Sequence, residues 1–202
     1  MQIGIAGLAG SGKSTIGLLL AKNIGYERYA YANPLKELCV AFIPELPWYG
    51  NKKEKETNYL VRDLDFNFMG YENTIGLRYD VLHMINMYFL DILENKEYVN
   101  AREVLQHIGT DIVRNNQGYD FWVNLGKAKE DVVITDVRFE NELVDYNIKI
   151  YGGVSTEGDN HISEVEIPDE HFDLILENKF SENPEEQLQQ LVKTIMENLP
   201  HA

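Results

Sequence analysis

The stretch Gly7-Leu8-Ala9-Gly10-Ser11-Gly12-Lys13-Ser14-Thr15 decides the fold of this chain. It fits the pattern G-x-x-x-x-G-K-[ST], in which a glycine-rich loop turns backbone N–H groups toward phosphate groups. The apolar residues 3–6 before it predict a buried strand, and the apolar spacing over residues 16–24 after it predicts a helix. A glycine-rich turn that merely resembles the motif is the alternative, but it would not explain why loop spacing, strand and helix agree.

The loop predicts a binding site for a nucleoside triphosphate. Glycine lacks a Cβ, so the backbone can curl around an anion, and the helix that follows adds the positive end of its dipole. We expect Lys13 to reach the β- and γ-phosphates and the Ser14 hydroxyl to ligate Mg²⁺. The residues expected to bind the triphosphate are Gly10, Ser11, Gly12, Lys13, Ser14 and Thr15.

A second apolar run, residues 131–136, predicts a strand of the kind that a parallel sheet buries on both faces. Asp136 stands at its carboxyl end, where ligands of open α/β sheets collect. If this strand neighbours the first one, the Asp136 carboxylate faces the metal bound by Ser14. Arg138 would lie at the same rim and could hold a phosphoryl oxygen. The alternative for Asp136 is a helix cap, and residues 138–147 are predicted to form a helix.

Residues 100–116 predict a helix with a polar stripe. One face is apolar, while polar residues recur every four positions on another: Arg102, Gln106, Thr110 and Arg114. Gly109 in the helix interior costs about 1 kcal/mol relative to Ala, which suggests that something approaches the backbone closely there. Two arginines, an amide and a hydroxyl suit a phosphorylated, hydrogen-bonding ligand. The alternative is a solvated helix face.

Composition narrows the partners. The 202 residues carry a formal net charge of −15, which argues against a nucleic-acid polymer or an anionic membrane as partner. The single cysteine, Cys39, excludes an intramolecular disulfide and fits a reducing compartment. The chain opens on a strand rather than a signal peptide, and no apolar run approaches 18 residues. We therefore expect a soluble, cytoplasmic protein.

The alternation of strands and helices predicts an α/β fold, with a parallel sheet flanked by helices, as a single domain over residues 1–202. Residues 44–80 are the least regular, and we interpret residues 44–100 as a mostly helical, acceptor-binding insertion. A polar loop within residues 155–166 is a candidate lid. Within it, His161, Ser163 and Glu164 are sequence neighbours, which favours a structural or lid role over a catalytic set.

The order of these motifs resembles the phage-type deoxynucleoside monophosphate kinases. The matching segments cover most of the chain: the glycine-rich loop, residues 31–36, 102–111 with Arg114, 120–123, 133–142 and 161–164. Two departures stand out. Asn33 occupies a position where the family pattern leads us to expect aspartate, and residues 155–158 lack the arginine expected ahead of the lid.

The resemblance implies a P-loop kinase fold that transfers the γ-phosphoryl of Mg²⁺-ATP to a deoxynucleoside 5′-monophosphate, in deoxynucleotide biosynthesis. It allows a homodimer, and a host-cytoplasmic location if the gene is of phage origin. Lys13, Asp136 and Arg138 would be catalytic, and Ser14 and Asp136 would hold the metal. Gln106 would contact the base, and the cations would hold the acceptor phosphate and the transferring group, in roles that the sequence alone does not separate. The residues expected to bind the acceptor are Lys36, Arg102, Gln106, Thr110, Arg114 and Arg138.

Two alternatives differ in chemistry. One is a P-loop kinase with another acceptor, such as dephospho-coenzyme A or phosphomevalonate. The other is a nucleotide-dependent switch module, for which slow hydrolysis without any acceptor is expected.

Overall fold

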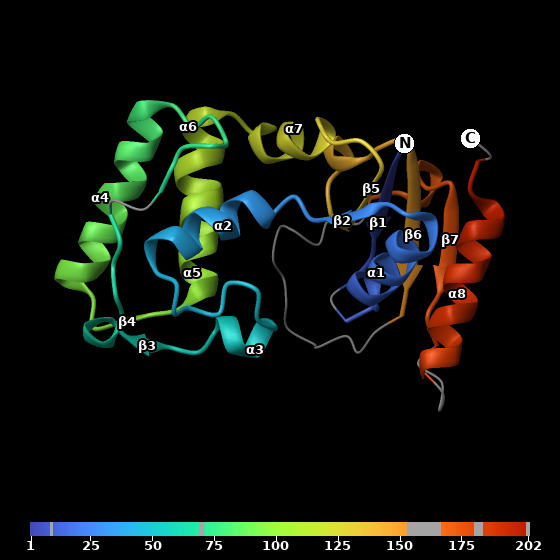
Figure 1. Cartoon of the computed structure of the whole chain (residues 1–202), viewed down its shortest axis with the longest axis horizontal. Coiled ribbons are helices and arrows are strands. Elements are labelled where there is room, and N and C mark those ends of the chain that lie inside the picture. Colours follow the sequence, from blue (N-terminus) through green and yellow to red (C-terminus); the bar gives the residue numbers. More distant parts are fainter. Residues whose placement is uncertain (9, 69–70, 153–166, 180–183, 201–202) are drawn as a thin grey trace. The chain divides into compact units, whose positions relative to one another are not determined.

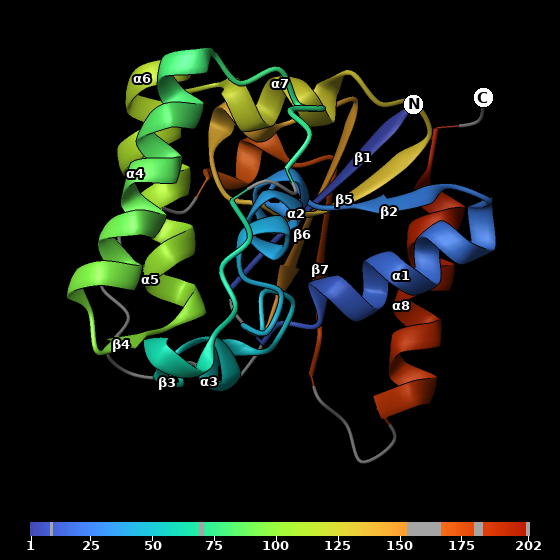
Figure 2. The same cartoon turned by 60° about the vertical axis from the view of Figure 1, so that its left-hand side comes forward.

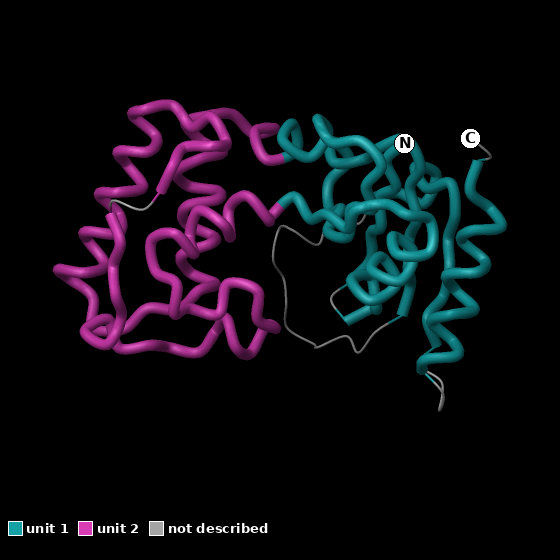
Figure 3. Tube along the Cα trace, in the orientation of Figure 1, with its two compact units in different colours: residues 1–31, 123–202 teal, residues 32–122 magenta. Residues whose placement is uncertain are grey.

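The computed structural model describes residues 1–8, 10–68, 71–152, 167–179 and 184–200. By its internal contacts the chain divides into two compact units, residues 1–31 with 123–202, and residues 32–122 (Figure 3). The expected insertion, residues 44–100, lies inside the second unit. The expected lid, residues 155–166, lies outside the described residues. His161, Ser163 and Glu164 and the segment 155–158 without the expected arginine belong to it, so they also lie outside the described residues.

The first unit is built on a five-stranded sheet in which every pairing is parallel, with the order β2-β5-β1-β6-β7 (Figure 1). Its strands are β1 (Gln2–Ala6), β2 (Glu27–Tyr29), β5 (Val132–Val137), β6 (Tyr146–Tyr151) and β7 (Leu174–Glu177). The central strand β1 pairs through Ile3 with Val133 on one side and with Tyr146 on the other. A continuous apolar run is what a strand covered on both faces requires. The predicted α/β fold with a parallel sheet is confirmed.

Helices cover both faces of this sheet. On one face α1 (Lys13–Ile24) and α8 (Pro184–Asn198) lie side by side and bury Ile16 and Ile195 against Ile3 and Ile148 (Figure 2). On the other face Val123 of α7 (Phe121–Lys127) joins a second apolar cluster. Its other buried members are Ala6, Tyr29, Tyr31, Val132, Ile134, Val137 and Ile167. The carboxyl end of β1 leads directly into the glycine-rich loop, which is followed by α1.

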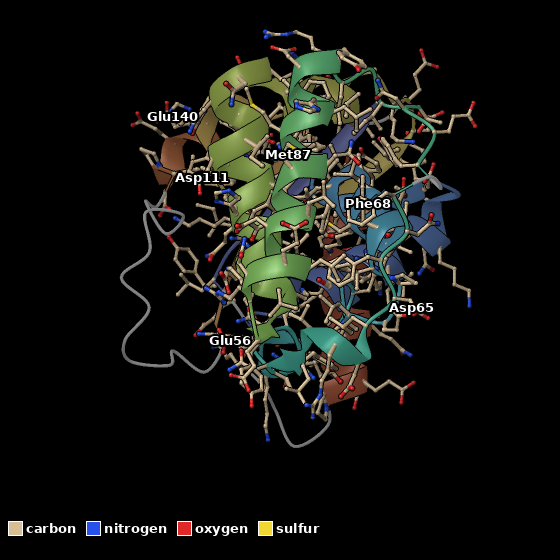
Figure 4. The ribbon with its side chains drawn as sticks, turned by 90° about the vertical axis from the view of Figure 1, so that its left-hand side faces the viewer. Glu56, Asp65, Phe68, Met87, Asp111 and Glu140 are labelled. Carbon is tan, nitrogen blue, oxygen red and sulfur yellow. The ribbon has the colours of Figure 1, made fainter. Side chains whose placement is uncertain are left out.

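The second unit is mostly helical. Its helices are α2 (Asn33–Phe42), α3 (Lys52–Lys55), α4 (Tyr79–Asn95), α5 (Ala101–Gln106), the π-helix η2 (His107–Arg114) and α6 (Asn115–Gln117). A short antiparallel pair, β3 (Tyr59–Leu60) with β4 (Tyr98–Val99), and the 3₁₀ turn η1 (Val61–Asp63) complete it. Stacked rings of Phe42 and Phe89, 4.4 Å apart, lie in its core. Helix α4, which carries Met87, runs beside the helix that carries Asp111 (Figure 4).

None of the helices in the described part of the chain is both long and apolar enough to cross a membrane.

The prediction of a helix over residues 138–147 is wrong. Only the 3₁₀ turn η3 (Glu140–Glu142) forms there, and β6 already begins at Tyr146; a further 3₁₀ turn, η5 (Asp169–His171), precedes β7. Leu143 already has an extended backbone (φ −63°, ψ 145°), and residues from Tyr146 on pair with β1 in the sheet, so the turn does not continue as a helix. The Glu142 side chain accepts the backbone N–H groups of Arg138 and Phe139 and so caps this single turn.

Candidate functional site

The glycine-rich loop sits between the carboxyl end of β1 and the first turn of α1. Gly12 precedes the helix with φ 90°, a backbone conformation that residues other than glycine rarely adopt. The N–H groups of the first helical residues, Lys13 and Ser14, have no acceptor within the helix and so are available to an anion. The loop therefore has the backbone form that phosphate binding requires.

Lys13 folds back over the loop. Its ammonium donates hydrogen bonds to the carbonyl oxygens of Gly7, at 2.5 Å, and Leu8, at 2.6 Å. The pKa of Lys13 is lowered from 10.5 to about 8, chiefly by burial and also by the neighbouring Arg138 guanidinium, while Asp136 opposes both. Lys13, Arg138 and Asp136 therefore share one electrostatic environment, as their predicted joint role requires. An anion placed there would relieve the repulsion between the two cations.

Asp136 lies where the sequence places it. Strand β5 pairs directly with β1, and Asp136 is its penultimate residue. The backbone N–H of Tyr31 donates to Asp136 Oδ1 at 2.8 Å, which holds the half-buried carboxylate. Ser14 is exposed at the second position of α1. A hydroxyl and a carboxylate are hard oxygen ligands, which Mg²⁺ prefers when nucleotide phosphates supply the rest of its shell, so these residues fit that ion.

Glu142 is a residue of this site that the motif analysis did not single out. It is buried, and its Oε2 accepts from the backbone N–H of Arg138 at 2.7 Å and of Phe139 at 3.3 Å. These bonds shape the turn that carries the exposed Arg138 side chain. The sequence signal for Glu142 is a carboxylate four residues after an arginine at a strand end. This pattern is too common to identify a site residue.

A pocket of about 390 Å³ opens beside the loop within the first unit. Its lining is Gly10, Gly12, Lys13, Ser14, Thr15, Asn178, Pro184 and Leu188. The last three come from the end of β7 and the start of α8, and sequence reasoning missed all three as site residues. Asn178 directly follows a parallel strand, so the strand-end rule that selected Asp136 could also have selected it.

A buried side-chain oxygen of the glycine-rich loop has no hydrogen-bond partner among the described residues. Ser11 is fully buried, and among the described residues nothing bonds to its Oγ. Buried hydroxyl groups are almost always paired with protein or water. The orphaned Ser11 Oγ therefore fits a loop built to receive an oxygen-rich group.

The polar stripe lies on the second unit. Its four residues, Arg102, Gln106, Thr110 and Arg114, are all exposed or half-buried, while Val104, Ile108 and Ile112 face the core. Their helix changes from α to π at His107. The stripe residues are four positions apart, which is slightly more than one α-helical turn of 3.6 residues and slightly less than one turn of a π-helix with its i→i+5 bonds. The stripe therefore winds around the helix in one direction along α5 and in the opposite direction along η2. The stripe is straighter than an α-helix would make it.

Gly109 is explained by packing. A Cβ at this position would lie 2.7 Å from Leu35 Cδ2, and the Trp122 Nε1–H donates to the Gly109 carbonyl at 3.0 Å. Both neighbours belong to the second unit and are buried. The close approach expected from the sequence is therefore real, but core side chains make it.

The cations of the second unit have different neighbours. Arg102 forms an ion pair with Glu56, with 3.0 Å between Nη1 and Oε1. The Arg114 guanidinium lies 5.2 Å from the centre of the Tyr119 ring. The half-buried Lys36 ammonium lies 5.2 Å from the centre of the exposed Tyr49 ring. Both of these cations therefore lie within cation–π distance of a tyrosine ring.

Comparison with known proteins gives one relevant similarity. No protein-family model matches the chain. Over 202 residues the chain is 27% identical to a protein of Acanthamoeba polyphaga mimivirus, covering 87% of this chain and 87% of that protein. That relative is named "Putative deoxynucleotide monophosphate kinase". Neither compact unit alone makes up so large a share of the chain, so the similarity extends over both.

Proposed function

We propose that this protein transfers the γ-phosphoryl group of ATP to a deoxynucleoside 5′-monophosphate, giving ADP and a deoxynucleoside diphosphate. The observation that carries the proposal is the pocket beside the glycine-rich loop, where a partly buried Lys13 shares its environment with Arg138 and Asp136. The name of the mimivirus relative supports a nucleotide as acceptor.

The donor is held by the first unit. Loop N–H groups and Lys13 bind the β- and γ-phosphates, and Arg138 stabilises the charge that develops on the transferring group. Ser14 and Asp136 would hold Mg²⁺, which supplies further charge neutralisation when it is bound. Phosphoryl transfer asks little covalent chemistry of a protein beyond this positioning and electrostatic stabilisation.

The acceptor is recognised by the second unit. The exposed amide of Gln106 suits the hydrogen-bonding edge of a base, and Thr110 adds a hydroxyl one step along the stripe. The cations Lys36, Arg102 and Arg114, together with Arg138, supply charge for the acceptor phosphate. Because Arg102 is paired with Glu56, an acceptor phosphate would have to compete with that carboxylate for its guanidinium.

A panel of acceptors tests the reaction. ADP formation is measured with Mg²⁺-ATP and each of the four deoxynucleoside monophosphates, the ribonucleoside monophosphates, dephospho-coenzyme A, phosphomevalonate and no acceptor. We expect turnover with at least one deoxynucleoside monophosphate and none with the last three. Turnover confined to another acceptor would replace the substrate, and slow hydrolysis insensitive to every acceptor would indicate a switch.

A bisubstrate ligand tests simultaneous binding. Phosphoryl transfer requires both nucleotides to meet in line, so an adenosine linked to a deoxynucleoside through five phosphates should bind more tightly than ATP. Binding no tighter than ATP would mean that the acceptor half finds no site. The homodimer stays a prediction, which sedimentation equilibrium checks.

A further inference from the structure

Asn178 bonds to the glycine-rich loop from the end of β7. Its Nδ2–H donates to the carbonyl oxygen of Ser11 at 3.0 Å. Asn178 is only 4% exposed, and its own backbone N–H donates to the Tyr151 carbonyl at 2.8 Å, which holds it against the end of β6. The buried Asn178 is thus held through its backbone at β6 and through its side-chain amide at the glycine-rich loop.

This bond sets the orientation of a peptide unit. The Ser11 carbonyl and the Gly12 N–H belong to one planar trans peptide, so they point in opposite directions. With the carbonyl held toward Asn178, the Gly12 N–H must face away from it. A Cβ on Gly12 would lie 2.7 Å from Asn178 Nδ2, so the close approach of the amide also depends on glycine there.

We propose that Asn178 is a positioning residue for the donor nucleotide: by holding the Ser11 carbonyl, it presents the Gly12 N–H to the bound polyphosphate. The inference rests on the proposed function, because it requires the loop to bind phosphates. Asn178 acts through the backbone and need not touch the nucleotide. The loop gains a preorganised N–H donor, so less ordering is needed when the anion binds.

The test separates this role from direct contact with the nucleoside, because Asn178 also lines the pocket. Dissociation constants of Mg²⁺-ATP and of inorganic tripolyphosphate with Mg²⁺ are measured by calorimetry for the wild type and Asn178→Ala. We expect both constants to rise about tenfold and by the same factor, as for loss of a hydrogen bond to a charged group. Asn178→Leu, which keeps the volume of the side chain, should behave alike if the alanine variant does not fold.

Asn147→Ala is the matched control. Asn147 is 7% exposed on β6, and its amide oxygen and nitrogen both bond the backbone of Val144, so its substitution also removes a buried, backbone-bonded amide. We expect its affinities to equal those of the wild type. Unchanged affinity in the Asn178 variants would overturn the positioning role alone, and so would weakening for ATP but not for tripolyphosphate. A wild type that binds neither ligand would overturn the proposed function as well.

Discussion

The Glu142 carboxylate accepts a hydrogen bond from the backbone N–H of Arg138, with 2.7 Å between Oε2 and nitrogen. The same oxygen accepts from Phe139, and the Tyr31 hydroxyl donates to the Glu142 carbonyl at 2.9 Å. Tyr31 in turn holds Asp136 through its backbone N–H. One buried residue thus connects the two strand-end groups that the proposed reaction uses.

Glu142→Gln should lower turnover more than it weakens ATP binding. The glutamine keeps the shape but can present an N–H donor where the two backbone N–H groups need an acceptor, so the turn below Arg138 loosens. We expect kcat to fall roughly tenfold and the free energy of unfolding by about 1–3 kcal/mol. Steady-state kinetics and thermal unfolding measure the two effects. Glu140→Gln, an exposed carboxylate on the same turn (Figure 4), is the control and should change neither.

Lys13→Met should lower the turnover and raise the free energy of unfolding. Loss of a charge-stabilising donor typically costs 10²–10³ in rate, so turnover should fall by about that factor or more. Burial holds the pKa of Lys13 below its value in the unfolded chain, which means that the folded protein pays for the charge at neutral pH. We therefore expect the free energy of unfolding without ligand to rise by about 1–3 kcal/mol at pH 7.

Chemical denaturation of both proteins across pH checks the sign. Above pH 8 the folded wild type gives up the Lys13 proton while the unfolded chain keeps it, so the advantage of the methionine variant should shrink from pH 8 upward. Lys22→Met, on the exposed side of the same helix, should show neither effect. A variant less stable than the wild type at pH 7 would contradict the buried-charge explanation.

ATP affinity should depend on pH above 8. Below that pH the Lys13 ammonium is charged and attracts phosphate; above it the free protein has a neutral amine, and binding must first take up a proton. The dissociation constant for Mg²⁺-ATP should be nearly constant from pH 6.5 to 7.5 and rise by up to about tenfold per pH unit beyond pH 8. Calorimetry in buffers of different ionisation enthalpy should detect up to about one proton taken up. Lys13→Met should show no such uptake.

Arg114→Ala should affect the acceptor more than the donor. Its guanidinium lies over the Tyr119 ring on the second unit, whereas the loop proposed to hold ATP belongs to the first. We expect KM for the monophosphate to rise at least about tenfold, as for loss of a charged hydrogen-bond donor, with the ATP constant within about twofold. Arg62→Ala, an exposed arginine of the same unit paired only loosely with Asp63, is the control. Equal losses for both nucleotides would assign Arg114 a structural or donor-side role.

Much of this molecule is local in origin, and local features were predictable from sequence. The strand, the glycine-rich loop and α1 follow from residues within a span of about two dozen positions. The carboxyl end of β5, where Asp136 is the penultimate residue, follows from its own local apolar run. Helical spacing failed over residues 138–147 because the backbone becomes extended at Leu143 and pairs with β1 from Tyr146 on, and local spacing does not reveal such a long-range pairing. Likewise no spacing rule anticipates that the helix of the stripe turns π at His107.

The sequence by itself determined the strand, the glycine-rich loop and the helix that carry the predicted phosphate site, because their apolar runs and glycines lie next to one another in the chain. Only the tertiary structure decided which distant groups serve that loop. Asn178 reaches Ser11 across 167 positions, and Asp136 reaches Tyr31 across 105. Such contacts depend on the order of strands in the sheet, which arises from packing of the whole unit and is written in no single segment.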